Sequence, residues 1–296
     1  MSCSRFCVLF IQWARLGTLS ASSNKTSGRA GILAPLNADI IRGFLVEQGV
    51  DQGCRVDILS SVTSTNDYLS EREYKDPGEI VICAAEQQTR GKGRFGHQWW
   101  SPPGVNLYLS MRWPLQPGGR QYETLGLWLL IAIARLLESL GVAGIRLKWP
   151  NDICTGHGKL GGVLIERKSS PPPGCLIIGV GLDVAMSLVG GPQKESGWTD
   201  LISAHPDWKI CRNELAAHVV RSLSDILIGF ESDRLGDLSC AWSKYDLIRH
   251  RNVRFICRDR GMTGVVQGVD VQGRIIMRVN GEELHLHSAH VREIRL

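Results

Sequence analysis

The segment EQQTRGKGRFGHQWWSPPG, residues 86–104, gathers four glycines, three basic side chains and two adjacent tryptophans. Three of the glycines can adopt positive φ and point neighbouring N–H groups at one oxyanion, namely Gly91, Gly93 and Gly96. Lys92 and Arg94 add full charges that can reach a phosphate or carboxylate. The segment lacks the Walker pattern, and its GxGxxG match opens no helix. These features predict a loop that closes over an anionic ligand, with a mobile surface connection as the alternative.

A second group of polar residues follows a short strand pattern in KWPND, residues 148–152. On that strand Arg146 and Lys148 would share one face, and the proline would end the hydrogen-bond ladder. Asn151 and Asp152 would then project from a turn, where an amide beside a carboxylate suits Mg²⁺-nucleotide or ribose binding. The structural alternative is an Asn-Asp turn that makes only local backbone bonds.

Two further segments add polar groups at the ends of predicted strands. Lys159 precedes Gly161 and Gly162 in an otherwise apolar strand, where glycines often mark the close approach of a ligand to the backbone. The segment TSTND, residues 63–67, offers hydroxyl and amide groups at a strand-to-helix junction, and an N-cap would use only one of them. A solvated lysine and an ordinary cap are the alternatives.

The elements that must position these groups indicate an α+β fold. Six segments have strand patterns: residues 55–62, 79–87, 106–113, 145–149, 159–166 and 175–184. Three helices are predicted: one capped by Asn37 and stopped by Gly49, one over residues 122–140 closed by Gly141, and one capped by Asn213. Because short turns join successive strands and helices lie between them, we expect a mostly antiparallel or mixed sheet.

The chain divides into three predicted parts. Residues 1–35 form an extension, 36–249 the main domain and 250–296 a small β-barrel of four or five short strands. The first 38 residues hold four basic residues, six serines and no acidic residue. That composition is typical of an organelle transit peptide, and a disordered extension or a misplaced start codon would also account for it.

The bulk composition is that of a globular protein, with 43% hydrophobic and 21% charged residues. A net charge of +5 is compatible with anionic ligands but does not indicate a nucleic-acid binder. Nine cysteines without a CxxC pair indicate neither a disulfide framework nor a zinc site, which favours reduced thiols in an intracellular protein. The apolar stretch at residues 124–134 is too short to span a bilayer.

Taken together and in order, these motifs resemble those of one family. They are STN at residues 64–66, QxxxGxGRxG at 87–96 with a tryptophan three residues on, KWPND at 148–152, and KLxG[IV]L[IV]E at 159–166. Residues 36–296 resemble the biotin–protein ligases. The resemblance implies a class II synthetase-like mixed sheet flanked by helices, followed by a small C-terminal SH3-like β-barrel.

Members of that family activate biotin with ATP to give biotinyl-5′-AMP and pyrophosphate. They then transfer biotin to one lysine of a carrier domain, typically in a carboxylase of the acetyl-CoA carboxylase type. The resemblance therefore implies biotin as substrate, with ATP and Mg²⁺. Preorganised donors and the metal would relieve the repulsion between the biotin carboxylate and the nucleotide phosphates. The substrate carboxylate is itself the nucleophile, so no nucleophilic side chain is required.

The resemblance also assigns roles to residues. It assigns biotin binding to Ser64, Thr65, Asn66, Gln87, Lys92, Gly93, Arg94, Trp99, Lys159, Gly161 and Gly162. It assigns ATP and Mg²⁺ to Gly91, Lys148, Asn151, Asp152, Asp183 and Trp198, with Asp152 as the metal ligand. Catalysis would depend first on Lys159, bridging the biotin carboxylate and the α-phosphate, with Lys92 and Arg94 on the closing loop.

Two residues depart from the family pattern. The common loop is GRGRxG, and Lys92 replaces its first arginine. It keeps the charge but loses the planar fork, so weaker retention of biotinyl-AMP is expected. Asp183 stands where the family usually has asparagine. A carboxylate near phosphates is unfavourable unless it meets Mg²⁺ or a basic partner.

A lipoate or octanoate protein ligase or transferase of the same fold group is the alternative enzyme, although KWPND and GKGRFG favour biotin. A biotin-responsive transcriptional repressor would need an N-terminal winged helix, whose helix–turn–helix pattern residues 1–35 lack, so no DNA binding is expected. We also expect no membrane association, whereas a homodimer stays open. A cytoplasmic location is expected, with a mitochondrion or plastid as the alternative if residues 1–35 are a transit peptide.

Overall fold

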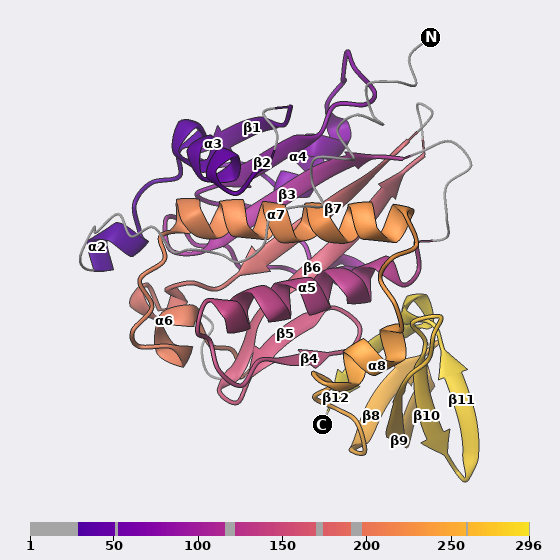
Figure 1. The fold of residues 1–296 in the computed structure, drawn as a ribbon. Helices are drawn as coiled ribbons and strands as arrows, with labels where there is room; N and C mark the ends of the chain where they lie inside the picture. The colour runs from indigo at the N-terminus through magenta and orange to yellow at the C-terminus, as the bar shows by residue number, and fades with distance from the viewer. Residues whose placement is uncertain are drawn as a thin grey trace.

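A computed structural model describes residues 29–50, 53–115, 122–169, 174–190, 197–258 and 260–295, without the side chains of residues 29, 30 and 293. It has the expected α+β architecture: a large mixed sheet flanked by helices, and a smaller curled antiparallel sheet at the C-terminal end (Figure 1). Most of the predicted N-terminal extension, residues 1–28, lies outside the described residues.

The main sheet has seven strands in the order β1-β2-β3-β7-β6-β5-β4. They are β1 (Arg55–Leu59), β2 (Val81–Ala85), β3 (Leu107–Pro114), β4 (Arg146–Lys148), β5 (Asp152–Thr155), β6 (Gly158–Lys168) and β7 (Cys175–Leu182). β1 and β2 run parallel, whereas the other neighbouring pairs are antiparallel. Every residue of β2 and β3 is buried, so both faces of the sheet centre must be covered.

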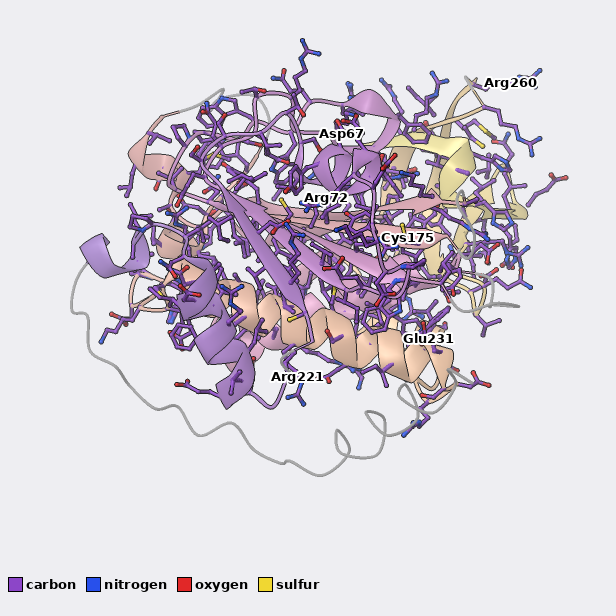
Figure 2. The ribbon with its side chains drawn as sticks, turned by 90° about the horizontal axis from the view of Figure 1, so that it is seen from above. Asp67, Arg72, Cys175, Arg221, Glu231 and Arg260 are labelled. Atoms are coloured by element: carbon purple, nitrogen blue, oxygen red, sulfur yellow. The ribbon has the colours of Figure 1, made fainter. Side chains whose placement is uncertain are left out.

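Helices cover the two faces of this sheet. On one face lie α3 (Ala38–Glu47), α5 (Leu125–Ser139) and α7 (Arg212–Glu231), and on the other lies α4 (Thr65–Glu71). Figure 2 shows α4, which carries Asp67, and α7, which carries Arg221 and Glu231, on opposite sides of the sheet. The shorter helices are α2 (Arg29–Ile32), α6 (Leu201–Ala204), α8 (Leu238–Ser243), η2 (Arg94–Gly96), η3 (Met186–Leu188) and η4 (Ser288–His290).

Three of the four predicted helix ends are confirmed, among them Gly49, which follows the last turn of α3 with φ at 71°. Asn37 caps α3 by accepting hydrogen bonds from two backbone N–H groups, and Gly141 follows α5 with φ at 94°. The cap predicted at Asn213 is wrong, because Cys211 caps α7 and Asn213 lies inside the first turn. There its side-chain amide accepts from Asn37 N at 2.8 Å and donates to a carbonyl of the N-terminal segment. A long-range contact thus uses the amide that a local cap would use.

The smaller sheet has the order β11-β10-β9-β8-β12, with all neighbouring pairs antiparallel. Its strands are β8 (Asn252–Cys257), β9 (Arg260–Val269), β10 (Ile275–Val279), β11 (Glu282–Leu286) and β12 (Val291–Arg295). Val253, Phe255 and Met277 from this sheet belong to the same buried core as the main sheet. The indole Nε1 of Trp149 donates to Gly273 O at 3.1 Å and joins the two sheets near the predicted site.

The segment that precedes α3 contributes side chains to the core of the main domain. Ile32 and Leu36 are 6% and 7% exposed and belong to the buried core. Across the described parts of the chain, each helix is too short or too polar to traverse a lipid bilayer.

Candidate functional site

A cavity of about 330 Å³ opens over the strands in the middle of the main sheet. Its walls come from β3, β6 and β7, from the turn after β4, from the loop after β2, and from β12 of the smaller sheet. Of the predicted site residues it gathers Ser64, Thr65, Asn66, Lys92, Gly93, Arg94, Trp99, Lys148, Asn151, Asp152, Lys159 and Gly162. Segments around residues 65, 95 and 150–162 therefore meet in one cavity.

The polar floor of the cavity lies at the start of α4. Ser64 is the N-cap, and its Oγ accepts from Asp67 N at 3.4 Å. The buried hydroxyl of Ser110 lies 2.7 Å from Thr65 Oγ1 and 2.6 Å from Asn66 Oδ1. Ser64, Thr65 and Asn66, which form this floor, are at most 4% exposed. Their hydroxyl and amide groups are thus held in fixed orientations before any ligand arrives.

The glutamine at this floor is Gln88, and the prediction of Gln87 is corrected. Gln88 Oε1 accepts from Thr65 N at 2.9 Å, and its Nε2 donates to Ser101 Oγ at 3.0 Å. Gln87 lies outside the cavity lining, and its Oε1 is 3.5 Å from Ser61 Oγ. Successive side chains of an extended segment point to opposite sides, so only one residue of the Gln-Gln pair can face the cavity.

We call residues 87–103 the glycine loop and residues 92–97 its tip. Of the glycines expected to take positive φ, only Gly96 does so, at 77°. Gly93 is extended, and its N–H donates to His97 O at 2.6 Å, so this N–H is used inside the loop. Gly91 lies outside the cavity lining. A Cβ there would come within 2.5 Å of Trp99 O, so the position needs glycine for close backbone approach.

Two cations at the tip are already paired with protein groups. Lys92 Nζ lies 2.7 Å from the Asp67 carboxylate on α4, and that hydrogen bond raises the pKa of Lys92. Arg94 donates to Ser288 O in η4, which directly precedes β12 of the smaller sheet, and burial lowers the pKa of its guanidinium. The tip therefore bridges α4 and the C-terminal sheet.

Lys159 lines the cavity from the start of β6. Its Nζ is 2.7 Å from Asp152 Oδ1 and 5.1 Å from the centroid of the Trp99 ring. Its backbone is held by residues 197–199, which precede α6. Lys159 N donates to Gly197 O at 2.7 Å, and Thr199 N donates to Lys159 O at 2.8 Å. The ammonium group is thus aimed into the cavity from a well-anchored strand.

The glycines of β6 and β7 bring backbone to the cavity surface. Gly162 lines the cavity, whereas Gly161 packs on β7, where a Cβ would lie 2.5 Å from Gly181 O. Gly179 and Gly181 line the cavity from β7, and a Cβ on Gly181 would lie 2.7 Å from the Trp99 ring. Sequence reasoning missed the two β7 glycines, although their spacing of two in an apolar strand is a signal for one bare face.

Asp183 and Trp198 lie outside the cavity lining. Asp183 is 3% exposed and accepts a hydrogen bond from Asn106 Nδ2 at 3.0 Å. Its hydrogen-bond partner is thus a neutral side-chain amide. Burial raises the pKa of the Asp183 carboxyl well above its usual range, while Lys159 opposes the shift and Asp200 reinforces it. Trp198 is bridged to the backbone of Lys159.

Within the described ranges, no cluster of three or more His, Cys, Asp or Glu side chains forms a metal site. Asn151 and Asp152 nevertheless line the cavity beside each other. A carboxylate with a neighbouring amide oxygen fits Mg²⁺, which proteins usually hold through one or two carboxylates together with substrate phosphates.

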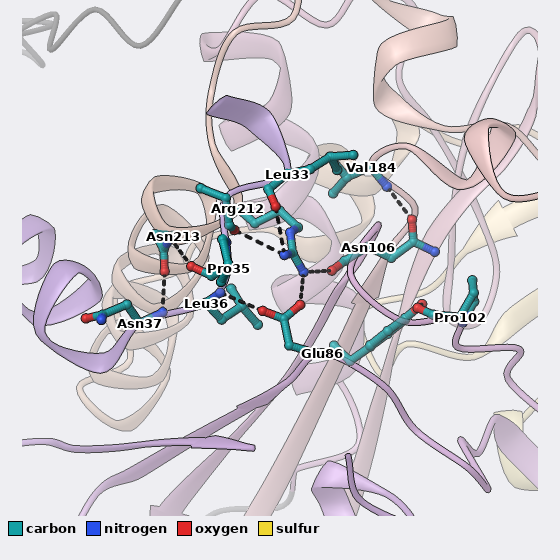
Figure 3. A network of polar contacts seen from close by, with 12 residues as sticks. Leu33, Pro35, Leu36, Asn37, Glu86, Pro102, Asn106, Val184, Arg212 and Asn213 are labelled. Carbon is teal, nitrogen blue, oxygen red and sulfur yellow. Dashed lines mark hydrogen bonds and ion pairs between the residues drawn. The ribbon is translucent and has the colours of Figure 1, made fainter. Parts of the chain in front are cut away.

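The base of the glycine loop is fixed by an ion pair between a buried arginine and a partly buried glutamate (Figure 3). Arg212 Nη1 donates to Glu86 Oε2 at 2.6 Å, and Arg212 is 1% exposed. The same guanidinium donates to Ala34 O at 3.1 Å and to Asn106 O at 3.3 Å. Glu86 Oε1 accepts from Leu36 N at 2.6 Å. Four segments are thereby tied together where the loop begins.

The C-terminal sheet contributes a wall that sequence reasoning did not predict. Val291, Arg292, Ile294 and Arg295 of β12 line the cavity. These residues follow KWPND by more than a hundred positions. They meet it only because the smaller sheet packs beside the cavity. No local pattern in β12 marks it as part of a site.

Comparisons with known proteins agree with this geometry. Residues 58–183 match the Biotin/lipoate A/B protein ligase family. The chain is 36% identical over 250 residues to the bifunctional ligase/repressor BirA of Escherichia coli, covering 83% of this chain and 74% of that protein. It is 28% identical to the biotin--[acetyl-CoA-carboxylase] ligase of Mycobacterium tuberculosis, covering 88% and 97% of the two chains.

A solved structure has the same fold. The biotin protein ligase from Aquifex aeolicus in complex with biotin and ATP superposes with a TM-score of 0.68 at 25% identity, covering 81% of this chain and 98% of that one. By sequence, fold and cavity together, this chain belongs to the biotin–protein ligase family.

Proposed function

We propose that this protein activates biotin with ATP and transfers it to a lysine of a biotin carrier domain of the acetyl-CoA carboxylase type. The observation that carries the proposal is the convergence of Lys92, Arg94 and Lys159 on a cavity with a polar floor and a tryptophan wall. A cavity lined by several cations suits two anionic substrates, and its aromatic wall suits an apolar ring system.

Biotin binds to the polar floor of the cavity and to the ring of Trp99. The ureido group of biotin has two N–H donors and one carbonyl acceptor, so it needs fixed partners of both kinds. Ser64, Thr65, Asn66 and Gln88 supply hydroxyl and amide groups for them. Gln88 takes the role expected of Gln87. Gly162 leaves room for the aliphatic tail to lie along the backbone of β6.

Adenylation joins two anions, the biotin carboxylate and the α-phosphate. A carboxylate oxygen attacks the α-phosphorus, the bond to the bridging oxygen breaks, and pyrophosphate leaves. Lys159 exchanges its contact with Asp152 for the carboxylate and the α-phosphate, and so stabilises the charge that builds up between them. In the second step the amine of the carrier lysine attacks the acyl carbon, and AMP leaves.

The nucleotide side of the cavity is formed by Lys148, Asn151 and Asp152. Asn151 and Asp152 would hold Mg²⁺, which supplies charge neutralisation for the triphosphate. Trp198, beside the backbone of Lys159, covers the adenine. Gly91 and Asp183 support the surrounding structure without contacting ATP.

The glycine loop protects the reactive intermediate. Biotinyl-5′-AMP is a mixed anhydride that water hydrolyses, so a closed loop must exclude solvent until the acceptor arrives. Lys92, Gly93 and Arg94 would contact the intermediate, and the tip would reopen for the carrier lysine.

We keep the division into a catalytic domain, residues 36–249, and a C-terminal barrel, residues 250–296, as part of this proposal, with residues 29–35 packed against the first. The proposed partner is a carboxylase carrier domain. Neither DNA binding nor a homodimer is required for this reaction. Reduced thiols and a supply of ATP favour the cytoplasm as its location.

The direct test is to incubate purified protein with biotin, Mg·ATP and a biotin carrier domain, and to detect labelled carrier with streptavidin. Lipoate in place of biotin is the matched substrate control. Carrier labelling with biotin is expected. Labelling with lipoate alone would overturn the proposal in favour of a lipoate ligase.

Lys159→Ala should reduce pyrophosphate release by about 10²- to 10³-fold, the range for loss of one preorganised charged donor. Lys209→Ala is the control, because Lys209 is exposed and lies outside the cavity lining. Circular dichroism and thermal melting would verify that both variants fold. Full activity of a folded Lys159→Ala variant would remove the proposed role.

A further inference from the structure

The tip of the glycine loop carries an exposed aromatic side chain in an unfavourable backbone conformation. Phe95 is 47% exposed, and its φ of 54° lies in the left-handed region. Residues other than glycine rarely adopt this region, and bulky ones least of all, because their Cβ crowds the backbone. An arrangement that costs both strain and exposed apolar surface needs a compensating contact.

That contact is made with two arginines. The Arg94 guanidinium lies 4.7 Å from the centroid of the Phe95 ring, and the Arg292 guanidinium lies 6.0 Å from it. Both distances are within the range of a cation–π interaction. Arg94 belongs to the loop, whereas Arg292 belongs to β12 of the C-terminal sheet. The Phe95 ring thus joins two elements that are almost two hundred residues apart.

The same segment of the C-terminal sheet makes a second contact with the loop. Arg94 donates to Ser288 O in η4, which directly precedes β12. Both Arg94 and Arg292 line the cavity, and Phe95 does not. Phe95 therefore lies behind two cations that face the cavity, where it can fix their positions without touching the ligand.

We propose that Phe95 is a positioning residue that couples the glycine loop to the C-terminal sheet by holding Arg94 and Arg292 together at the cavity mouth. The inference rests on the proposed function for its catalytic consequence: the coupled loop retains biotinyl-5′-AMP, and release of the Phe95 contact opens the cavity to the acceptor. The coupling itself is a property of the ligand-free protein.

The test compares Phe95→Ala, Phe95→Tyr and Arg292→Ala with a control, Arg278→Ala. Arg278 is an exposed arginine on β10 of the same sheet, outside the cavity lining. The rate at which biotinyl-5′-AMP leaves the enzyme should rise about 3- to 20-fold in Phe95→Ala and in Arg292→Ala, the effect of losing one cation–π contact. Phe95→Tyr keeps an aromatic face and should restore the wild-type rate.

A structural role unrelated to positioning would affect different quantities. The pyrophosphate-release rate at saturating biotin and ATP should stay within about twofold of wild type in Phe95→Ala, because the ring does not contact the reacting atoms. The double variant Phe95→Ala/Arg292→Ala should release the intermediate no faster than either single variant. Additive effects in the double variant would overturn the coupling.

A second measurement separates this inference from the proposed function. Hydrogen exchange of residues 92–97 and of β12, measured without substrates, should become faster in both elements in Phe95→Ala and stay unchanged in Arg278→Ala. If the wild type forms no biotinyl-5′-AMP but exchange still rises in both elements, the proposed function fails and the coupling stands. Faster exchange at the tip alone would overturn the coupling.

Discussion

The glycine loop is held in contrasting ways at its base and at its tip. At the base, Glu86 pairs with Arg212, which is 1% exposed, and Gly104 N donates back to Glu86 O at 3.0 Å. At the tip, Lys92 pairs with Asp67 while 44% of its side chain is exposed. A buried pair resists separation because each charge would be left without solvent, whereas an exposed pair exchanges its partner for water at little cost. The base is therefore a fixed hinge, and the tip is able to move.

This difference follows from what each region must do. The base sets the positions of Gln88 and of the floor, which must not change between substrates. The tip has to close over the intermediate and open for a protein acceptor. A loop that was equally firm at both ends would trap its product, and one that was loose at both ends would lose it to water.

The largest expected effect comes from breaking the base. Arg212→Met leaves the Glu86 carboxylate without its partner, and it should lower the free energy of unfolding by about 3 kcal/mol. That value is at the lower end of the range for a broken buried pair, because the Glu86 side chain is 20% exposed. Denaturant titration measures the change.

Two further variants define this result. Arg234→Met alters an exposed arginine just after α7 and should change stability by less than about 0.5 kcal/mol. Arg212→Met/Glu86→Gln removes the stranded charge and should recover part of the loss. If Arg212→Met costs no more than Arg234→Met, the base is not a fixed hinge.

The second-largest effect is expected at Asp183. Its carboxyl accepts from Asn106, whose backbone carbonyl in turn accepts from Arg212 at the base. Burial raises the folded-state pKa of Asp183 above the ordinary value of 3.8. Its contribution to stability is therefore fully present below the unfolded pKa and is lost as the pH rises through the folded pKa. Asp183→Asn keeps an acceptor for Asn106 and carries no charge. It should raise Tm by a few degrees at pH 7.5, with a difference that shrinks toward pH 4.

Thermal melts at pH 4.5, 6.0 and 7.5 measure this dependence, and the wild type serves as the reference at each pH. A lower Tm of Asp183→Asn at pH 7.5 would mean that the ionised carboxylate is stabilised by its surroundings. The buried polar groups near the base would then favour a charge that burial alone disfavours.

The smallest effect is expected at the tip. Lys92→Met and Asp67→Asn should each change the free energy of unfolding by less than about 1 kcal/mol, as for other exposed ion pairs. The coupling energy in the double-mutant cycle should vanish in 1 M NaCl, because salt screens exposed charges. A coupling of about 2 kcal/mol that persists in salt would show that the tip is held as firmly as the base.

Much of the fold was predictable because its elements have strong local patterns. The helix over residues 122–140 is apolar nearly all round, since α5 lies between the main sheet, α7 and α8. The cap at Asn37 and the turn at Gly141 follow from backbone chemistry that acts within a few residues. The motifs also predicted which segments share a cavity, because one ligand chemistry requires their residue types together.

The errors arose where long-range contacts decide between local alternatives. Gln87 and Gln88 have the same side chain, and only pairing with the neighbouring segment fixes which one faces Thr65. Asn213 has the chemistry of a helix cap, yet its amide binds the N-terminal segment. The wall formed by β12 has no local signal, because its place depends on how the C-terminal sheet packs.

The floor beneath the cavity consists partly of bare main chain. A methyl group on Gly179 would collide with Asn66, and one on Gly181 would collide with Trp99. These two positions consequently offer no side chain that could be shortened to enlarge the pocket. Efforts to make the enzyme accept bulkier vitamin analogues should keep these two glycines of β7. They should alter the glycine loop or β12, whose side chains line the cavity and can be replaced.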